Sequence, residues 1–442
     1  MLSVRRERDG RASQAFAAIL VGMSRRWRSP RPCAVRRGFA SATIGVALAL
    51  VATSCGPAGD SDVPPSPFPA RTGQGTRVSV SGFAIDWFAA RLSWRQPSNA
   101  TAVQIWRDSR LIDRVAAAKR TYTDRLLWER SRYDYAVVFV DPRGRAVGSY
   151  RVPVNTPALT TPFPRLYADS SFWNTPIAPD ARAEPGSATI ISNSLVRYAS
   201  TANLVNSLEH GYPIAYADPA STRFPIGCTK YDCQTNVSFR IPAYARPNTG
   251  SDGHLVVLDP ATGEELDMFA AACCWRAASR YATSMGGSGA ICPPGSRCNG
   301  AVAAGFAEAA GIIRPEEIAQ GHIDHALAVA TPYTRADYIA CPATHTDGQY
   351  SATAIPEGAR IQLDPGFDVQ AQKWPRWQKI IATAFQVYGG YIADTSGSLA
   401  VRAEANLDRG YNAWTKAGVP SGSPSLADLP WSRFRLLAVT QC

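Results

Sequence analysis

Residues 133–150 read YDYAVVFVDPRGRAVGSY. Apolar and polar side chains alternate on both sides of a central Asp-Pro-Arg-Gly sequence, which is typical of two half-buried strands joined by a tight turn. The strands of this hairpin are expected at 133–141 and 146–154. Alternating segments of the same kind precede it, bounded by turn residues, at 78–85, 90–94 and 102–107. This region is therefore expected to form several antiparallel β-strands.

Short sequences within the region resemble those of a fibronectin type III domain. They are LSW (92–94), IWRD (105–108), LIDRV (111–115), YTD (122–124), YDYAVVFVDPRG (133–144) and VGSY (147–150). Leu127 and Tyr133 also stand at the spacing of a tyrosine corner. The resemblance implies a fibronectin type III β-sandwich over residues 77–156, which would serve as a spacer or binding module without catalytic residues. In secreted bacterial proteins such domains often accompany enzymes that act on polysaccharides, a link by analogy alone.

The N-terminal 55 residues have the features of an export signal. Arg36 and Arg37 precede an apolar run at 38–52 that is too short to span a bilayer comfortably. The sequence around the two arginines resembles the twin-arginine export motif, and residues 52–55 resemble a bacterial lipobox, with Ala52 in place of the usual leucine. We therefore predict a signal peptide at 1–55 and lipidation at Cys55, with an ordinary cleaved signal as the alternative.

The charge distribution argues against nucleic acid as a partner. The chain of 442 residues has a formal net charge of +11, but residues 1–55 hold ten arginines against two acids. The remainder has 36 basic and 33 acidic groups, so it lacks the basic excess that phosphate binding requires. Length and a hydrophobic content of 45% indicate two or three globular domains.

Two linkers divide the rest of the chain. Residues 56–76 are rich in Pro, Gly, Ser and Asp and are expected to form a flexible tether, and a shorter linker is expected at 157–163. Residues 164–442 would then form one large domain of short strands, with helices at 187–208 and from Pro375 to the Gly-Gly pair at 389–390. We expect a mainly β protein whose larger domain is a disulfide-stabilised β-sandwich or jelly roll with a few helices. Strands are expected there at 212–216, 237–241, 254–258, 266–270, 323–329, 359–363, 391–393 and 399–402.

Eight cysteines follow Cys55, an even number that favours disulfides in an exported protein. Cys228 with Cys233, and Cys292 with Cys298, are close enough to close small loops. The neighbouring Cys273 and Cys274 are expected to reach Cys341 and Cys442. A zinc site is less well supported, because no second cysteine pair has the spacing of a zinc ribbon.

Candidate catalytic residues are concentrated around the histidines. The sequence GHIDHAL at 321–327 holds two of the five histidines in the chain. On a helix His322 and His325 could chelate a metal, but the β-rich sequence that follows favours a strand, on which they point to opposite faces. No metal and no cofactor is therefore expected. His325 is either a pocket residue or a core histidine bonded to a backbone carbonyl.

Two routes for cleaving a glycosidic bond remain open from the sequence. Hydrolysis needs two carboxyl groups, for which Asp252 and Asp267 are the candidates, tuned by histidines. β-Elimination needs a base and a positive partner for a uronate, which His254, His325 or His345 with Arg314 would supply. On a strand Glu265 and Asp267 share one face. Several tryptophans, including Trp275, are candidates for stacking on sugar rings.

The larger domain also resembles a broad group of secreted bacterial proteins of unassigned activity. The resemblance covers most of residues 164–415 and rests on SDGHLVVLDPATGEELDMFAA, AAGFAEAAGIIRPEEIAQGHIDHALAVATP, YIACPATHTDG and IPEGARIQLDPGFDV. It implies a shared pocket formed by Asp252, His254, His325 and His345, with an acid at the position of Asp267, and no established reaction.

The sequence as a whole predicts an exported, lipid-anchored protein that cleaves a polysaccharide or cell-wall glycan by hydrolysis or β-elimination. It would be held at the outer face of the cytoplasmic membrane or at the cell surface, or released. The alternative is a non-catalytic cell-surface protein that binds a glycan or another protein.

Overall fold

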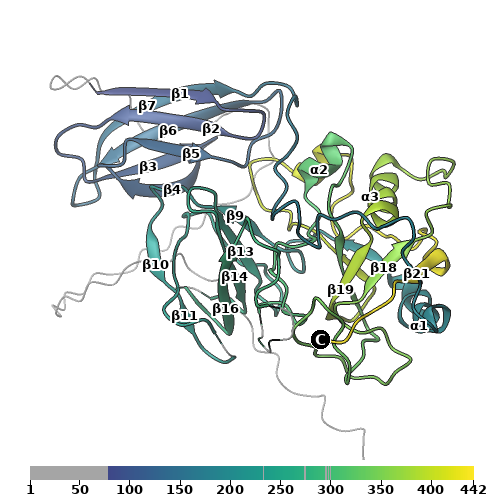
Figure 1. Ribbon diagram of the computed structural model, residues 1–442. Helices are drawn as coiled ribbons and strands as arrows, with labels where there is room; N and C mark the ends of the chain where they lie inside the picture. Colours follow the sequence, from purple (N-terminus) through teal and green to yellow (C-terminus); the bar gives the residue numbers. More distant parts are fainter. Residues whose placement is uncertain (1–77, 232, 273–274, 294–295, 297, 299) are drawn as a thin grey trace, which may run out of the picture. The chain divides into compact units, whose positions relative to one another are not determined.

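A computed structural model describes residues 78–442, except for 232, 273–274, 294–295, 297 and 299 (Figure 1). The predictions of a signal peptide, of lipidation at Cys55 and of a tether at 56–76 lie outside the described residues. Cys273 and Cys274 also lie outside the described residues. Among the described residues, no helix is long and apolar enough to cross a membrane.

Seven strands form two antiparallel sheets at the start of the described chain (Figure 1). The sheet orders are β1-β2-β5 and β4-β3-β6-β7. The strands are β1 (Ser79–Ala84), β2 (Ala90–Arg95), β3 (Ala102–Arg107), β4 (Arg110–Ala116), β5 (Thr121–Asp124), β6 (Arg132–Val140) and β7 (Ala146–Asn155). The two sheets enclose one apolar core, so the expected strands are confirmed and two further strands, β4 and β5, complete the sandwich.

The β6–β7 hairpin explains why residues 133–150 form this sandwich. Every second residue from Tyr133 to Phe139 is buried, because alternate side chains of a strand face the core. Asp141 closes the turn by accepting backbone hydrogen bonds of 2.8 Å from Arg143 and 2.9 Å from Arg145. The hydroxyl of Tyr133 accepts a 2.7 Å hydrogen bond from the backbone of Trp128, which is the bond of a tyrosine corner.

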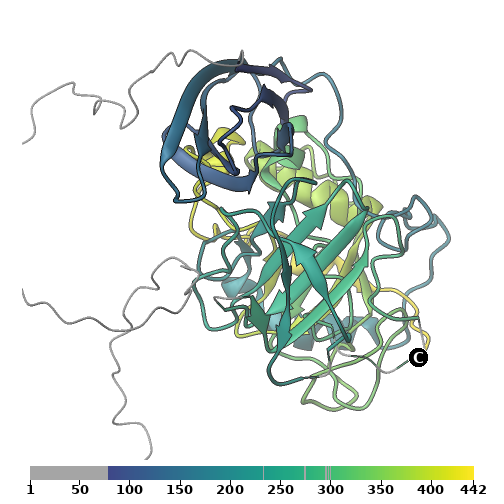
Figure 2. The same cartoon turned by 90° about the vertical axis from the view of Figure 1, so that its left-hand side faces the viewer.

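The rest of the chain is built on two larger sheets, whose strands run side by side in Figures 1 and 2. The four-stranded sheet has the order β16-β14-β13-β9 and the six-stranded sheet the order β21-β18-β19-β17-β20-β8. Three of the pairs are parallel: β9 with β13, β17 with β19, and β8 with β20. The strands are β8 (Asn203–Val205), β9 (Ile214–Tyr216), β13 (Leu255–Asp259), β14 (Glu264–Phe269), β16 (Ser279–Ser284), β17 (Leu327–Thr331), β18 (Arg360–Leu363), β19 (Gly390–Thr395), β20 (Ala400–Arg402) and β21 (Phe434–Leu436).

Short strand pairs and a few helices complete the fold, which is mainly β as expected. Two small sheets pair β10 with β12 and β11 with β15. Their strands are β10 (Arg223–Pro225), β11 (Gly227–Cys228), β12 (Ser238–Arg240) and β15 (Arg276–Ala277). The helices are α1 (Ser187–Ser194), α2 (Pro315–Gln320), α3 (Arg376–Val387) and α4 (Ala413–Lys416), with 3-10 turns η1 (Val196–Thr201) and η2 (Trp431–Arg433).

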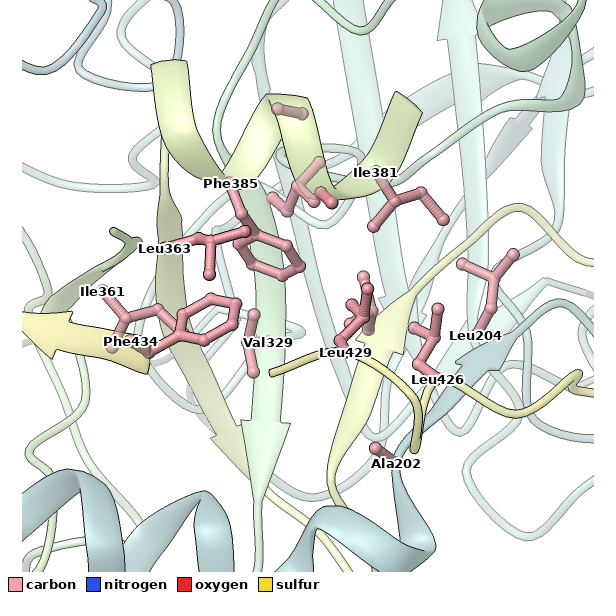
Figure 3. Packing of buried hydrophobic residues seen from close by; sticks show 14 of the residues in the cluster. Ala202, Leu204, Val329, Ile361, Leu363, Ile381, Phe385, Leu426, Leu429 and Phe434 are labelled. Carbon is pink, nitrogen blue, oxygen red and sulfur yellow. The ribbon is translucent and has the colours of Figure 1, made fainter. Parts of the chain in front are cut away.

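Helix α3 covers the six-stranded sheet and confirms the second predicted helix. Figure 3 shows Ile381 and Phe385 of α3 packed above Val329, Ile361 and Leu363 of that sheet. The helix ends at Gly389, whose φ of 72° lets its backbone N–H bond to Ala384 at 3.0 Å. A Cβ at this glycine would lie 2.4 Å from the carbonyl oxygen of Ile361, so a larger residue does not fit.

Two expected elements are shorter than the sequence suggested. The helix predicted at 187–208 is only α1, followed by η1 and by strand β8. The strand predicted at 323–329 begins at Leu327, which leaves His325 in the loop after α2. Residues 203–205 are extended because β8 pairs with β20, and His325 is held outside β17 by its contact with Glu317 of α2.

Three disulfides join described cysteines. Cys228–Cys233 and Cys292–Cys298 close small loops, as predicted. Cys341 bonds to Cys442. The prediction that these two cysteines pair with Cys273 and Cys274 is therefore wrong, because the chain end folds back beside Cys341: the backbone N–H of Cys341 bonds to Thr440 at 2.8 Å.

The N-terminal sandwich contacts the rest of the chain through polar groups. Ser221 donates a 2.7 Å hydrogen bond to Asp113 of β4, and the backbone of Thr123 donates one of 2.8 Å to Asp218. Arg107 pairs with Asp124 at 2.7 Å and also donates to the carbonyl of Arg409 at 3.1 Å. These bonds tie the sandwich to the following part at several points, which a freely moving spacer would not need.

Candidate functional site

Strand β14 carries two carboxyl groups on one face, as the alternation of strand side chains predicts. Glu265 and Asp267 are both fully buried. The hydroxyl of Tyr167 donates a 2.8 Å hydrogen bond to Oε2 of Glu265, and the backbone of Ala309 donates one of 2.9 Å to Oε1. The backbone of Glu308 donates a 3.0 Å bond to Oδ2 of Asp267. The two carboxyl groups thus hold the loop before α2 against the four-stranded sheet.

Burial and mutual repulsion keep a proton on this pair. Burial raises the pKa of Asp267 well above its usual range, and the neighbouring Glu265 raises it further. Burial also raises the pKa of Glu265. Since no part of Asp267 is exposed, its carboxyl has no surface from which to contact a polymer.

His254 lies beside this pair and contacts a second buried acid. Its Nδ1 forms a close ion pair with Oε1 of Glu308. The imidazole is held between two aromatic rings, with centroid distances of 4.8 Å to Tyr212 and 5.4 Å to Phe269. His254 and Asp267 are therefore brought together through Glu308, which contacts one by its side chain and the other by its backbone.

An arginine connects the aromatic ring of Tyr212 to the six-stranded sheet. The guanidinium of Arg402, at the end of β20, lies 4.8 Å from the ring centroid of Tyr212 and pairs with Asp394 of β19. Burial raises the pKa of Asp394 to about 6, against the lowering effect of Arg402. The side chain of Asp394 is 22% exposed, so this carboxyl group reaches the surface.

Asp394 is one of three carboxyl groups that converge at this edge of the sheet. Carboxylate oxygens of Asp347, Glu357 and Asp394, which we call the carboxyl triad, all lie within 4.8 Å of one another. Oγ1 of Thr395 lies 2.6 Å from Oδ1 of Asp347 and 3.3 Å from Oε1 of Glu357. Glu357 is fully buried whereas Asp347 is exposed. The triad therefore leads from the interior of the protein to its surface.

The carboxyl triad favours the protonated form of its buried member, Glu357. Burial raises the pKa of Glu357 well above its usual range, and its hydrogen bond to Asp347 raises it further, as does repulsion by both neighbouring acids. A proton held by the buried Glu357 can pass along this hydrogen bond to Asp347, which is exposed to solvent. The same three oxygen ligands would also suit a hard divalent cation.

His325 and Arg314 belong to a different cluster, at the start of α2. Oε1 of Glu317 lies 2.7 Å from Arg314 and 3.1 Å from Nε2 of His325. Burial alone would raise the pKa of Glu317, but the lowering effect of Arg314 and His325 is larger, so this pKa falls to about 2. Nδ1 of His325 lies 2.8 Å from the carbonyl of Ala326. Both ring nitrogens thus face acceptor groups of the protein, and the side chain is buried, so neither nitrogen is placed to contact a substrate.

The remaining predicted residues do not join one pocket. Asp252 is exposed and accepts a 3.1 Å hydrogen bond from Ser251. Trp275 is half-buried, with its ring 6.2 Å from that of Phe224. His345 lines a separate surface cavity. The structure thus brings His254 and Asp267 together and places His325 and His345 elsewhere. Only a cavity of about 10 Å³, enough for one water molecule, adjoins His325 and Arg314.

Four charged residues of this site were missed by sequence reasoning, and three of them left a signal. Glu308 is a lone acid within the apolar segment 300–313, where a buried charge must have a partner. Asp394 and Arg402 each stand at the end of a short apolar strand. Glu357 follows a proline in a loop and had no such signal. Asp394 and Arg402 would have been candidates if the ends of strands had been searched for charged residues.

Comparisons with known proteins reach only part of the chain. No family model and no curated protein matches it. Solved structures that align include fibronectin(III)-like modules of Clostridium thermocellum CbhA, with 12% identity, 19% of this chain and 98% of that chain covered, and a TM-score of 0.17. Another is the fn3 domain of human collagen alpha-1(XX), with 13% identity, 23% and 99% covered, and a TM-score of 0.18. The Yersinia enterocolitica Family 28 exopolygalacturonase aligns at 16% identity over 20% of each chain, with a TM-score of 0.17. None of these likenesses bears on the carboxyl triad.

Proposed function

We propose that this protein hydrolyses glycosidic bonds of a polysaccharide, with the carboxyl triad as its acid–base centre. The observation that carries the proposal is the chain of carboxyl groups from the buried Glu357, whose pKa is raised well above its usual range, to the exposed Asp347, with Asp394 beside them. Glycoside hydrolysis needs one carboxyl that holds a proton and a second that is ionised. The substrate class rests on the fibronectin type III resemblance, because such domains often accompany enzymes that act on polysaccharides.

Each member of the triad has a distinct role in this proposal. Asp347 is the exposed group that contacts the glycosidic oxygen and delivers the proton it shares with Glu357. Asp394 is the ionised carboxylate at neutral pH, because its pKa is about 6. Arg402 pairs with Asp394 and favours that ionised form. Transfer of the proton to the leaving oxygen while Asp394 attacks the sugar carbon or activates a water would break the bond.

His254 acts through its neighbours in this scheme. It is close enough to Asp394 for its charge to lower the pKa of that group. Its ring fixes Tyr212, above which Arg402 lies. The fully buried Asp267 and Glu265 position the loop that carries Glu308, and Glu308 in turn contacts His254. His254 and Asp267, which were both predicted from the sequence as site residues, thus help to position the residues of the carboxyl triad.

β-Elimination is less well supported by the geometry. The base and the positive partner considered for that route were a histidine and Arg314. Arg314 is 2% exposed and its guanidinium is bound to Glu317 and stacked over Phe163 at 4.5 Å. Because it is buried, its guanidinium is not accessible to the carboxylate of a uronate polymer.

The test is to incubate the purified protein with a panel of neutral, uronate-containing and cell-wall polysaccharides. Hydrolysis releases reducing ends without the ultraviolet absorbance of unsaturated products, whereas elimination produces both. We expect reducing ends alone, and their loss in Asp347→Asn and Asp394→Asn. Asp324→Asn is the matched control, because the side chain of Asp324 is 46% exposed and pairs with the exposed His322. Binding of a glycan without any product would indicate the non-catalytic alternative.

We also propose that the protein is exported and anchored through Cys55. Three disulfides among the described residues agree with an oxidising compartment. The expected result is incorporation of labelled palmitate into the expressed protein but not into a Cys55→Ala variant. An unlabelled protein with a free N-terminus after a nearby residue would instead show an ordinary cleaved signal.

A further inference from the structure

A surface cavity of about 350 Å³ is lined in part by His345 and Thr346, which directly precede Asp347 of the carboxyl triad. Its lining includes Asp337, Ile339, Thr344, His345, Thr346 and Gln441. This volume lies at the lower end of the range for small-molecule sites. The catalytic scheme proposed above makes no use of it.

The imidazole of His345 is oriented by the backbone. Its Nδ1 lies 3.0 Å from the carbonyl oxygen of Ala303. A carbonyl only accepts hydrogen bonds, so in the neutral ring Nδ1 carries the hydrogen and Nε2 has the lone pair. His345 therefore presents an acceptor, which is what a sugar hydroxyl needs as a partner.

The other polar groups of the cavity are held in place as well. Oγ1 of Thr344 donates a 3.2 Å hydrogen bond to the carbonyl of Cys298. Oγ1 of Thr346 donates to the carbonyl of Arg335 at 3.2 Å and accepts from the backbone of Gly348 at 3.0 Å. The cavity is thus preformed, which lowers the entropy lost when a ligand binds.

The cavity and the triad share one segment of chain. Asp347 follows His345 by two residues and accepts the hydrogen bond of Thr395 next to Glu357. An exposed aromatic residue is bonded to the lining: the backbone of Ala336, a lining residue, donates a 2.9 Å bond to the carbonyl of Tyr350. Tyr350 is 42% exposed, and its ring is tilted against that of Tyr333 at a centroid distance of 4.2 Å. A flat apolar ring of this kind is a suitable platform for a sugar face.

We propose that this cavity binds one neutral sugar unit of a glycan chain whose next bond lies at the carboxyl triad. The inference rests on the proposed function for the position of the scissile bond, but not for binding itself. The described lining contains the carboxylate of Asp337 and neither a lysine nor an arginine. The carboxylate of Asp337 is already paired with Arg335 at 2.7 Å, so the lining offers the carboxylate of a uronate no unpaired cation, which disfavours a uronate.

Binding is to be measured by calorimetry with the full chain bearing Glu357→Gln, which cannot supply the stored proton. The probes are a neutral β-glucan, a mannan, a xylan and, as the charged counterpart, polygalacturonate. We expect at least one neutral glycan to bind and polygalacturonate to bind at least tenfold more weakly. Polygalacturonate as the tighter ligand would overturn the assignment of a neutral sugar.

Two further variants locate the binding. Ala336 is exposed at the rim, so Ala336→Trp should block the cavity and reduce affinity at least tenfold without lowering the melting temperature. Ala118→Trp is the matched control, since it makes the same change at an exposed alanine of the N-terminal sandwich. His345→Ala should weaken binding about five- to tenfold. Unchanged affinity in Ala336→Trp, or no binding of any neutral glycan, would overturn the proposal.

The outcome also separates this inference from the proposed function. A glycan that binds in the cavity but is not cleaved by the unmodified protein would contradict hydrolysis and leave the subsite intact. Cleavage that is unaffected by Ala336→Trp, in both kcat and KM, would leave hydrolysis intact and contradict the subsite.

Discussion

Oγ1 of Thr395 lies 2.6 Å from Oδ1 of Asp347, a residue 48 positions earlier in the chain. This contact joins the last residue of β19 to the loop that carries His345, and it places the exposed Asp347 of the carboxyl triad beside Glu357 and Asp394. It is the point at which the cavity and the proposed acid–base centre meet.

Thr395→Val should lower kcat about tenfold or more, because a hydrogen bond to a charged group contributes roughly 1.5–3 kcal/mol. Asp347 would lose its orientation, whereas substrate binding in the cavity would not change, so KM should stay within about twofold. Thr395→Ser keeps the hydroxyl and should restore kcat. Equal losses in both variants would point to a packing role of the threonine methyl group.

The stereochemistry of cleavage can be predicted from the spacing of the acids. Carboxylate oxygens of Asp347 and Asp394 lie within 4.8 Å, near the separation of about 5–5.5 Å found in retaining glycosidases. The first product released should therefore have the anomeric configuration of the substrate. Proton NMR of the anomeric signal early in the reaction measures this, and an inverted product would rule out this pair as acid and nucleophile.

The pH dependence of activity should report the ionisation of Asp394. A carboxyl group with a pKa of about 6 is protonated below that pH and ionised above it. Because the scheme needs the ionised form, kcat/KM should rise with pH through about 6 and fall again only where the proton shared by Glu357 and Asp347 is lost. Thermal unfolding over the same pH range is the control. A profile that is already flat from pH 4 upwards would exclude Asp394 as the ionised group.

The stability of the fold should depend on pH through Asp267. Its pKa in the folded protein is raised well above the unfolded value of about 3.9. Its contribution to stability is therefore fully present below pH 4 and is lost as pH rises through the folded pKa. Asp267→Asn keeps a donor towards Glu265 and removes the titration. Urea unfolding at pH 4 and pH 8 should show a smaller decrease in the free energy of unfolding for this variant than for the unmodified protein.

The disulfides should differ in how much each of them stabilises the folded protein. The Cys341–Cys442 bond closes a sequence separation of 101 residues, and Cys228–Cys233 one of 5. In the chain-entropy model a loop of about 100 residues is stabilised by about 4.7 kcal/mol, and short loops by less. Replacing both cysteines of the long loop by alanine should lower the melting temperature several degrees more than the same change in the short loop. Similar decreases for both pairs would show that strain or the unfolded state dominates.

The hairpin at 133–150 and helix α3 show what local sequence can specify. Their apolar periods match the repeat of a strand and of a helix, so neighbouring residues alone determine which side faces the core. The same rule placed Glu265 and Asp267 on one face of β14. It failed for His325, because a turn and the ion pair with Glu317 hold that residue outside the strand that begins at Leu327.

The candidate site was only partly accessible from the sequence. His254 was recognised because an imidazole beside a buried strand is unusual, and its position next to Glu308 agrees with that interpretation. Glu357 and Asp394 lie 37 positions apart and come together only because β19 runs beside the loop after His345. No local pattern connects two such residues, so pairing them by sequence would have required the sheet order.

The sequence by itself determined a mainly β chain, the tight hairpin of the N-terminal sandwich, the two small disulfide loops and the need to accommodate buried charges. Those features depend on contacts within a few residues, where periodicity and turn chemistry act. Only the tertiary structure decided that Cys341 bonds to Cys442, that His325 belongs to a capping cluster, and that three acids converge at one edge of a sheet. Convergence of this kind depends on how parallel strands cross over, which is set by packing of the whole core and not by any one segment.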